Sequence, residues 1–185
     1  GTFSYGKNFG IVENSSLERI TGRLNAQHRF LDDKLTLSFQ GSISRVNDEV
    51  APLSGSAGFR GDLLGSAYSA NPTWPLNPDF EGTGGLTSPS ALLKYTETLV
   101  FTNRYLLNAS ANYEITDELS AKVNVGYDIG DSFAGSATSG RARNVDQGAT
   151  GNGVASIGQL DTENKLLEVT LNYRKDFGNS KLDVL

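Results

Sequence analysis

Two pairs of neighbouring acids in short polar segments, and the single histidine, are candidates for acid–base chemistry in this sequence. Asp32 adjoins Asp33 and Asp117 adjoins Glu118, and two carboxylates can hydrolyse a glycoside when they flank its bond. Both pairs fall in short polar segments between apolar runs, where acids favour turns and solubility. His28, the only histidine, has no nucleophile nearby in the sequence to complete a triad or metal site. The sequence therefore predicts no catalytic site and no enzyme activity.

A Gly-rich segment carries oxygen-bearing side chains of the kind that bind calcium, at Asn144, Asp146, Asn152 and Asp161. Their spacing does not match the EF-hand pattern, so we expect ordinary loop polarity, no metal site and no cofactor. The chain has no cysteine, which excludes disulfides and Cys-ligated metals. Its formal net charge of −5 argues against nucleic acid as a partner, because phosphates need a basic patch.

The strongest binding candidates lie within residues 47–98. Three aromatic side chains alternate there with amides, and two prolines, Pro72 and Pro75, stiffen the segment. Flat rings beside amides suit stacking on, and hydrogen bonding to, a sugar or a peptide. The candidate substrate-binding residues are Tyr68, Trp74, Asn71, Asn77 and Phe80. The alternative is that Trp74 anchors this loop against neighbouring structure.

Apolar and polar residues alternate with a period of two, the signature of β-strands. Five stretches show the pattern and a sixth begins near the C-terminus: 20–30, 35–44, about 99–115, 119–129 and 167–174. Several are about twice the usual 5–6 residues and approach the roughly 9–11 that cross a bilayer at a tilt. The polar faces carry five charged residues that we expect to face a barrel lumen: Arg23, Arg29, Arg104, Lys122 and Asp128.

The connections between these stretches alternate between short and long. Residues 31–34, 116–118 and 176–180 are tight, whereas about 47–98 and 130–163 are long. Short periplasmic turns opposite long extracellular loops are typical of outer-membrane barrels. Aromatic residues lie near both strand ends, as in the two girdles of such barrels. The predicted fold is all-β: about 5–6 strands of a larger antiparallel, up-and-down transmembrane β-barrel in a lipid bilayer.

Seven segments are spread in order over most of the chain, at residues 10–15, 18–25, 70–75, 88–93, 102–107, 119–127 and 166–173. Together they resemble the barrel of SusC/RagA-like, TonB-dependent outer-membrane transporters of the Bacteroidetes type. The resemblance implies a location in the bacterial outer membrane, coupling to the TonB complex and a SusD-like surface lipoprotein as partner. The family imports oligosaccharides or peptides through a large barrel that holds a plug. No plug is recognisable in this sequence, and we expect the chain to be one portion of a larger barrel.

These observations predict nutrient import, with substrate captured in the outward-facing vestibule and released by parts outside this chain. Removal of residues 65–85 should then abolish capture and leave the barrel intact. Two alternatives share the alternation. One is a structural or adhesive outer-membrane barrel without transport, and the other is a soluble carbohydrate-binding β-sandwich, whose apolar faces would meet in a core.

Overall fold

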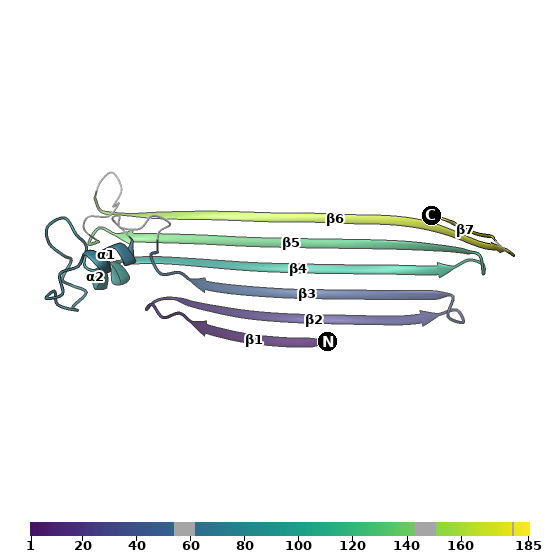
Figure 1. Ribbon diagram of the computed structural model, residues 1–185, viewed down its shortest axis with the longest axis horizontal. Helices are drawn as coiled ribbons and strands as arrows, with labels where there is room; N and C mark the ends of the chain where they lie inside the picture. Colours follow the sequence, from purple (N-terminus) through teal and green to yellow (C-terminus); the bar gives the residue numbers. More distant parts are fainter. Residues whose placement is uncertain (54–61, 143–150, 179) are drawn as a thin grey trace.

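A computed structural model describes residues 1–53, 62–142, 151–178 and 180–185 as one long antiparallel sheet. Each strand pairs only with its neighbours in the chain, so strand order equals sequence order (Figure 1). The strands are β1 (Thr2–Phe9), β2 (Ser16–Phe30), β3 (Leu35–Glu49), β4 (Thr96–Glu114), β5 (Leu119–Ser139), β6 (Gly153–Phe177) and β7 (Ser180–Val184). The predicted all-β, up-and-down antiparallel architecture is confirmed. The sheet is open, with β1 and β7 at its two edges.

The register of the strands gives the sheet two unlike faces. One rung aligns His28, Leu37, Ala111, Val123 and Val169. The adjacent rung aligns Gln27, Ser38, Ser110, Asn124 and Glu168. Because successive residues of a strand point to opposite sides, the first rung belongs to one face, which we call the apolar face, and the second rung belongs to the other, which we call the polar face.

Tight turns close one end of the sheet. In the β2–β3 turn, Leu31, Asp32 and Asp33 have φ angles of 55°, 54° and 67°, and the Lys34 amide donates to the Leu31 carbonyl at 3.1 Å. Aspartate tolerates this left-handed backbone better than most residues. In the β4–β5 turn, the Leu119 amide donates to the Thr116 hydroxyl oxygen at 3.0 Å. Both acidic pairs thus lie in tight turns, as predicted.

The strands extend further than the alternation predicts. Residues 47–49 belong to β3 and residues 96–98 to β4, so the first long connection covers residues 50–95. Residues 130–139 belong to β5 and residues 153–163 to β6, which reduces the predicted connection 130–163 to residues 140–152. The N-terminal strand β1 was not predicted, and it brings the number of strands to seven instead of five or six.

Burial in this fold is confined to the long-loop end. None of the residues in the seven strands is buried. The buried side chains belong to the loops, among them Ala51, Leu63, Ala91, Leu92 and Ala142. Two short helices, α1 (Leu63–Ser69) and α2 (Pro89–Tyr95), carry three of these residues. Neither helix has the length and hydropathy needed to cross a membrane.

Candidate functional site

Residues 62–95, which we call the cap, form a small folded unit at the end of the sheet (Figure 1). Asp62 caps α1: its carboxylate, 1% exposed, accepts from the amides of Leu64 at 3.3 Å and Gly65 at 3.1 Å. Proline stands in the first turn of α2, where its missing N–H removes no helical bond. Leu92 is fully buried. The cap is thus an ordered structure within the predicted loop.

Two turns of like sequence shape the cap. Asn71-Pro72-Thr73-Trp74 and Asn77-Pro78-Asp79-Phe80 share the pattern Asn-Pro-X-aromatic. Each asparagine side-chain oxygen accepts from the amide two residues later, at 2.9 Å from Thr73 and 3.0 Å from Asp79. Each asparagine carbonyl accepts from the amide of the aromatic residue, at 2.9 and 3.0 Å. Trp74 and Phe80 then meet edge to face, with ring centroids 5.4 Å apart.

The predicted substrate-binding residues therefore divide into two groups. Asn71 and Asn77 use their side-chain oxygens to hold turns, and Trp74 and Phe80 pack on each other while staying partly exposed. Tyr68 on α1 is 94% exposed. Of the five candidates, Tyr68 has the ring most open to a ligand.

Asp79 fixes the cap to the end of the sheet. Its carboxylate accepts from the Lys94 ammonium at 2.8 Å, the Tyr95 hydroxyl at 2.9 Å and the Arg141 guanidinium at 3.5 Å. The hydrogen bonds from Lys94 and Tyr95 hold the pKa of Asp79 below its ordinary value, and the charge of Arg141 adds to this. Sequence reasoning missed this cluster, because the partners of Asp79 lie 15 to 62 residues after it in the chain.

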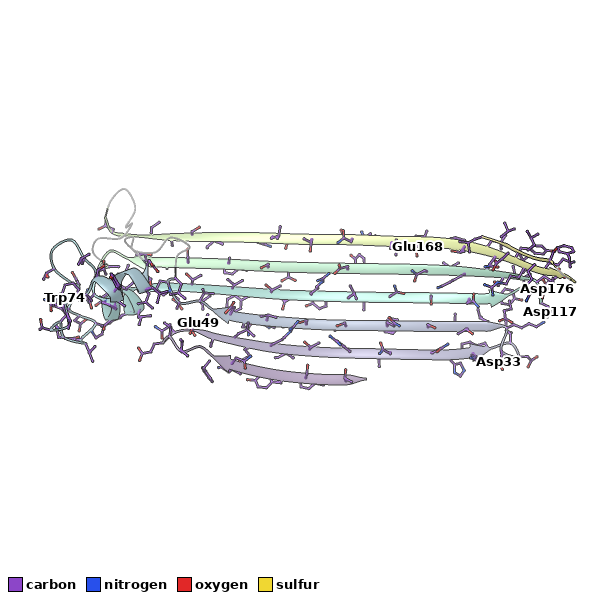
Figure 2. The ribbon with its side chains drawn as sticks, in the orientation of Figure 1. Asp33, Glu49, Trp74, Asp117, Glu168 and Asp176 are labelled. Carbon is purple, nitrogen blue, oxygen red and sulfur yellow. The ribbon has the colours of Figure 1, made fainter. Side chains whose placement is uncertain are left out.

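Protonation of Asp79 at acidic pH should destabilise the cap. Because its pKa is lower in the folded protein, the cluster stabilises the fold above the ordinary aspartate pKa of about 3.9. That contribution is lost as the pH falls through the lowered pKa. Hydrogen exchange at the Phe80 amide, corrected for intrinsic rates, should therefore accelerate on acidification. Asp79→Asn should abolish this pH dependence, and Asp117→Asn, at the far end of the sheet (Figure 2), should preserve it. An unaltered pH dependence in Asp79→Asn would contradict the assignment.

All five residues predicted to line a lumen lie on the polar face of the sheet, as the register requires. Arg104 and Asp128 form a two-pronged ion pair there, with distances of 3.1 and 2.9 Å. Arg23, Arg29 and Lys122 are exposed on the same face. On this face Asn124 also donates to Glu168 at 3.0 Å. The polar face thus presents hydrogen-bonding groups along its length.

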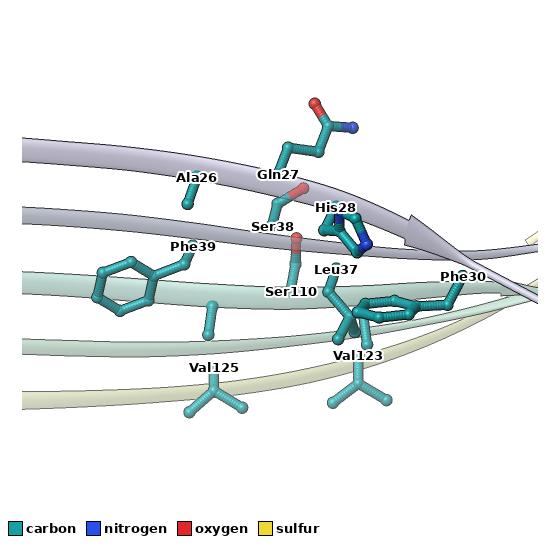
Figure 3. Close-up of a pocket in the computed structure, with 12 residues that line it drawn as sticks. Ala26, Gln27, His28, Phe30, Leu37, Ser38, Phe39, Ser110, Val123 and Val125 are labelled. Carbon is teal, nitrogen blue, oxygen red and sulfur yellow. The ribbon is translucent and has the colours of Figure 1, made fainter. Parts of the chain in front are cut away.

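An apolar hollow of about 470 Å³ lies on the other face. Its walls are Leu37, Phe39, Val123 and Val125, and small alanines form its floor. Figure 3 shows Leu37, Val123 and Val125 on the opposite side of the sheet from Gln27 and Ser38. His28 packs edge to face on Phe30 at 4.4 Å between centroids. Gln27, Ser38 and Ser110 border the hollow from the polar face, and His28 is the polar side chain that lines it on the apolar face. With a single polar side chain among apolar ones, the hollow suits hydrocarbon better than a sugar or peptide.

The remaining sequence candidates do not come together. Asp33, Asp117 and Asp176 lie at the tight-turn end, opposite Trp74 (Figure 2). Glu118 pairs with Lys175 at 3.1 Å. Of the calcium candidates, Asn144 and Asp146 lie outside the described residues, and Asp161 accepts from Gln159 within β6. Within the described ranges, no three metal-ligating His, Cys, Asp or Glu side chains gather.

Comparison with known proteins adds no family to these observations. No protein-family model matches the chain, and no curated protein matches it. The fold, its two faces and the cap are therefore the features that point to a function.

Proposed function

We propose that this chain is part of the wall of a bacterial outer-membrane β-barrel that imports oligosaccharides or peptides. One observation carries the proposal: a single sheet with an apolar and a polar face, neither of which is buried. A water-soluble sheet covers its apolar face with a helix or a second sheet. In the proposed setting, lipid covers the apolar face and the polar face lines the lumen.

Exposed side chains on the apolar face support a lipid contact. Large hydrophobic residues stand open along β2 to β6, including Leu24 at 53%, Val125 at 48% and Leu171 at 56% exposure. Soluble monomers rarely expose apolar patches beyond a few hundred Å². A β-sandwich would bury such residues against a second sheet, whereas the described residues form only one.

The open edges of the sheet support a larger barrel. β7 pairs with residues 173–177 of β6, and among the described residues no strand pairs with the outer edge of residues 153–172. In lipid, each unsatisfied backbone group costs several kcal/mol, and closed bacterial barrels have at least about eight strands. Further strands beside β1 and β7 would satisfy these groups. A plug, the TonB complex and a SusD-like lipoprotein enter the proposal through the family resemblance alone.

The cap is the proposed place of substrate capture. It lies at the end of the sheet opposite the tight turns, which is the extracellular end in barrels of this kind. Tyr68 offers a free ring, and the Trp74–Phe80 pair stands nearby in the chain on rigid turns. Ordered aromatic residues lose little entropy when a ligand stacks on them, which favours affinity.

Tyr68→Ala should weaken capture about tenfold, the equivalent of a stacking contact near 1.4 kcal/mol. The measurement is uptake by whole cells of a panel of labelled oligosaccharides and oligopeptides. Leu76→Ala is the matched control, because Leu76 is an equally open cap residue without a ring. Undiminished uptake in Tyr68→Ala would remove Tyr68 from the site. A folded barrel that takes up none of the panel would favour the structural or adhesive alternative.

A further inference from the structure

Charge on the apolar face does not follow a single rung. On β6 this face carries Lys175 beside the β6–β7 turn, where Lys175 pairs with Glu118 at 3.1 Å. Beyond the tight-turn end, the first Asp, Glu, Lys or Arg is Glu18 in β2, Arg45 in β3, Asp131 in β5 and Lys165 in β6. In β1 it is Lys7, which pairs with Glu18 across the β1–β2 ladder and lies 3.8 Å from it. In β4 it is Glu97, but Asn103 already stands on the rung of Arg45 and Asp131 and donates to Asp131 at 2.8 Å.

The register turns these residues into an oblique line. The rung of Lys7 and Glu18 reaches β6 at Gln159. Arg45 and Asp131 lie on the rung of Asp161, and the charge that ends the uncharged stretch of β6 is Lys165. The line thus shifts six residues, about 20 Å, over five interstrand steps that span about 24 Å. That slope corresponds to about 40°, within the roughly 35–45° tilt of strands in outer-membrane barrels.

The tight turns shift in the same direction. The last rung of the β2–β3 hairpin, Phe30 with Leu35, aligns with Leu171 of β6. The β6–β7 hairpin instead closes at Phe177 with Ser180, six residues further along β6. On the apolar face of β6, Lys175 ends the uncharged surface at Tyr173, two residues beyond the rung of Phe30 and Leu35. Both limits of the apolar surface therefore run obliquely to the rungs, in the same direction.

Between these limits lies a belt that holds no Asp, Glu, Lys or Arg on its apolar face. It comprises Ile20–Phe30, Leu35–Ile43, Tyr105–Tyr113, Leu119–Ile129 and Leu167–Tyr173. On β2 to β5 these segments have nine to eleven residues, or about 30–37 Å of strand. At the inferred tilt their height is about 25 Å, the height of the apolar band of outer-membrane barrels. The hollow of Figure 3 lies within the belt.

We infer that bilayer hydrocarbon contacts this oblique belt alone, and that β4 to β6 continue beyond it as a polar wall standing in water. The inference rests on the proposed membrane location and adds the depth and tilt of each strand. Beyond the belt, the same face carries Asp131, Asp161 and Glu97, with Phe101, Phe133 and Ile157 as isolated apolar residues among them. The wall raises the cap away from the lipid surface.

Single-cysteine variants test the inference, and each can be labelled at one position only, because the chain itself has no cysteine. Each variant of the intact protein carries an environment-sensitive fluorophore in phosphatidylcholine vesicles with brominated acyl chains. Leu24→Cys and Lys165→Cys form the sharpest pair, since the two residues share one rung. Bromine should quench the label at Leu24 several-fold more strongly than at Lys165. Equal quenching at both would mean that lipid depth follows the rungs, and would overturn the inferred tilt.

A second set of positions separates this inference from the proposed function. Ala111→Cys lies inside the belt, whereas Ala137→Cys and Ala155→Cys face each other across a rung of the wall. We expect bromine to quench the label at Ala111, and aqueous iodide to quench the labels at Ala137 and Ala155. Bromine quenching at all three would extend lipid over the wall and overturn the belt, with the membrane location retained. No bromine quenching at Ala111 would overturn the membrane location itself.

Discussion

Ala111→Arg is expected to destabilise the sheet in a bilayer strongly. Ala111 lies inside the belt, two residues from its centre on β4 at Ala109, and on the rung of Leu37 and Val123. Arginine on the lipid face at mid-bilayer costs about 2–4 kcal/mol in outer-membrane barrels, a large part of typical protein stability. The measurement is the urea midpoint of unfolding in phospholipid vesicles.

The neighbouring residue provides the control. Ser110 lies on the same strand but on the polar face, between Ser38 and Asn124. Ser110→Arg should therefore leave the midpoint nearly unchanged, because its guanidinium would point to water. Equal destabilisation by the two substitutions would mean that the faces do not meet different solvents, and the proposed orientation would fail.

Gly82→Ala should disorder the cap while the sheet stays folded. Gly82 has a φ of +113°, and a Cβ at this position would stand 2.1 Å from the Leu86 carbonyl oxygen and 2.9 Å from the Ser88 amide nitrogen. Both of these atoms belong to the backbone, so neither can rotate away from the added Cβ as a side-chain atom could. We expect a cost of about 3 kcal/mol or more from strain and clash together. The measurement is the rate of limited proteolysis between residues 62 and 95.

A substitution at Gly84 is the control that distinguishes steric clash from backbone strain at Gly82. Gly84 has a φ of +65°, and its Cβ would meet no atom within 4 Å. Gly84→Ala should cost only the left-handed strain, about 1–2 kcal/mol. Equal proteolysis rates for the two variants would show that the close approach at Gly82 has no energetic weight.

Alternation predicted the strands where the two faces differ. Leu35 to Ile43 and Leu119 to Ile129 alternate cleanly, and both lie in the belt. Residues 131–139 and 153–163 are strands of the same sheet, but polar and small residues predominate on both of their faces, with Phe133, Ile157 and Leu160 among the exceptions. A period of two in hydropathy indicates that the two faces of a strand meet different environments, and a strand without that difference does not show it. β1 escaped prediction for a related reason, since Lys7 interrupts its row of aromatic residues, Phe3, Tyr5 and Phe9.

The cap was predictable in composition and not in geometry. Aromatic residues among amides and prolines indicated a shaped surface, and the repeated Asn-Pro-X-aromatic pattern could have predicted the two turns. The Ser88-Pro89 pair likewise indicates the start of a helix, because proline is favoured in a first helical turn, and α2 begins there. The role of Asp79 could not be read from the sequence, because its partner Arg141 arrives from the β5–β6 connection.

The ion pair between Arg104 and Asp128 bears on how the strands find their partners during assembly. A slip of β4 against β5 by one residue would exchange the faces of one strand and bring a charge such as Lys122 towards lipid, so the bilayer itself would reject the error. A slip of two residues keeps every face correct and escapes that rejection. It would, however, separate the two-pronged contact of Arg104 with Asp128. If the sheet lies in a membrane as proposed, this ion pair therefore favours the correct register over the even-numbered slips that lipid would not oppose.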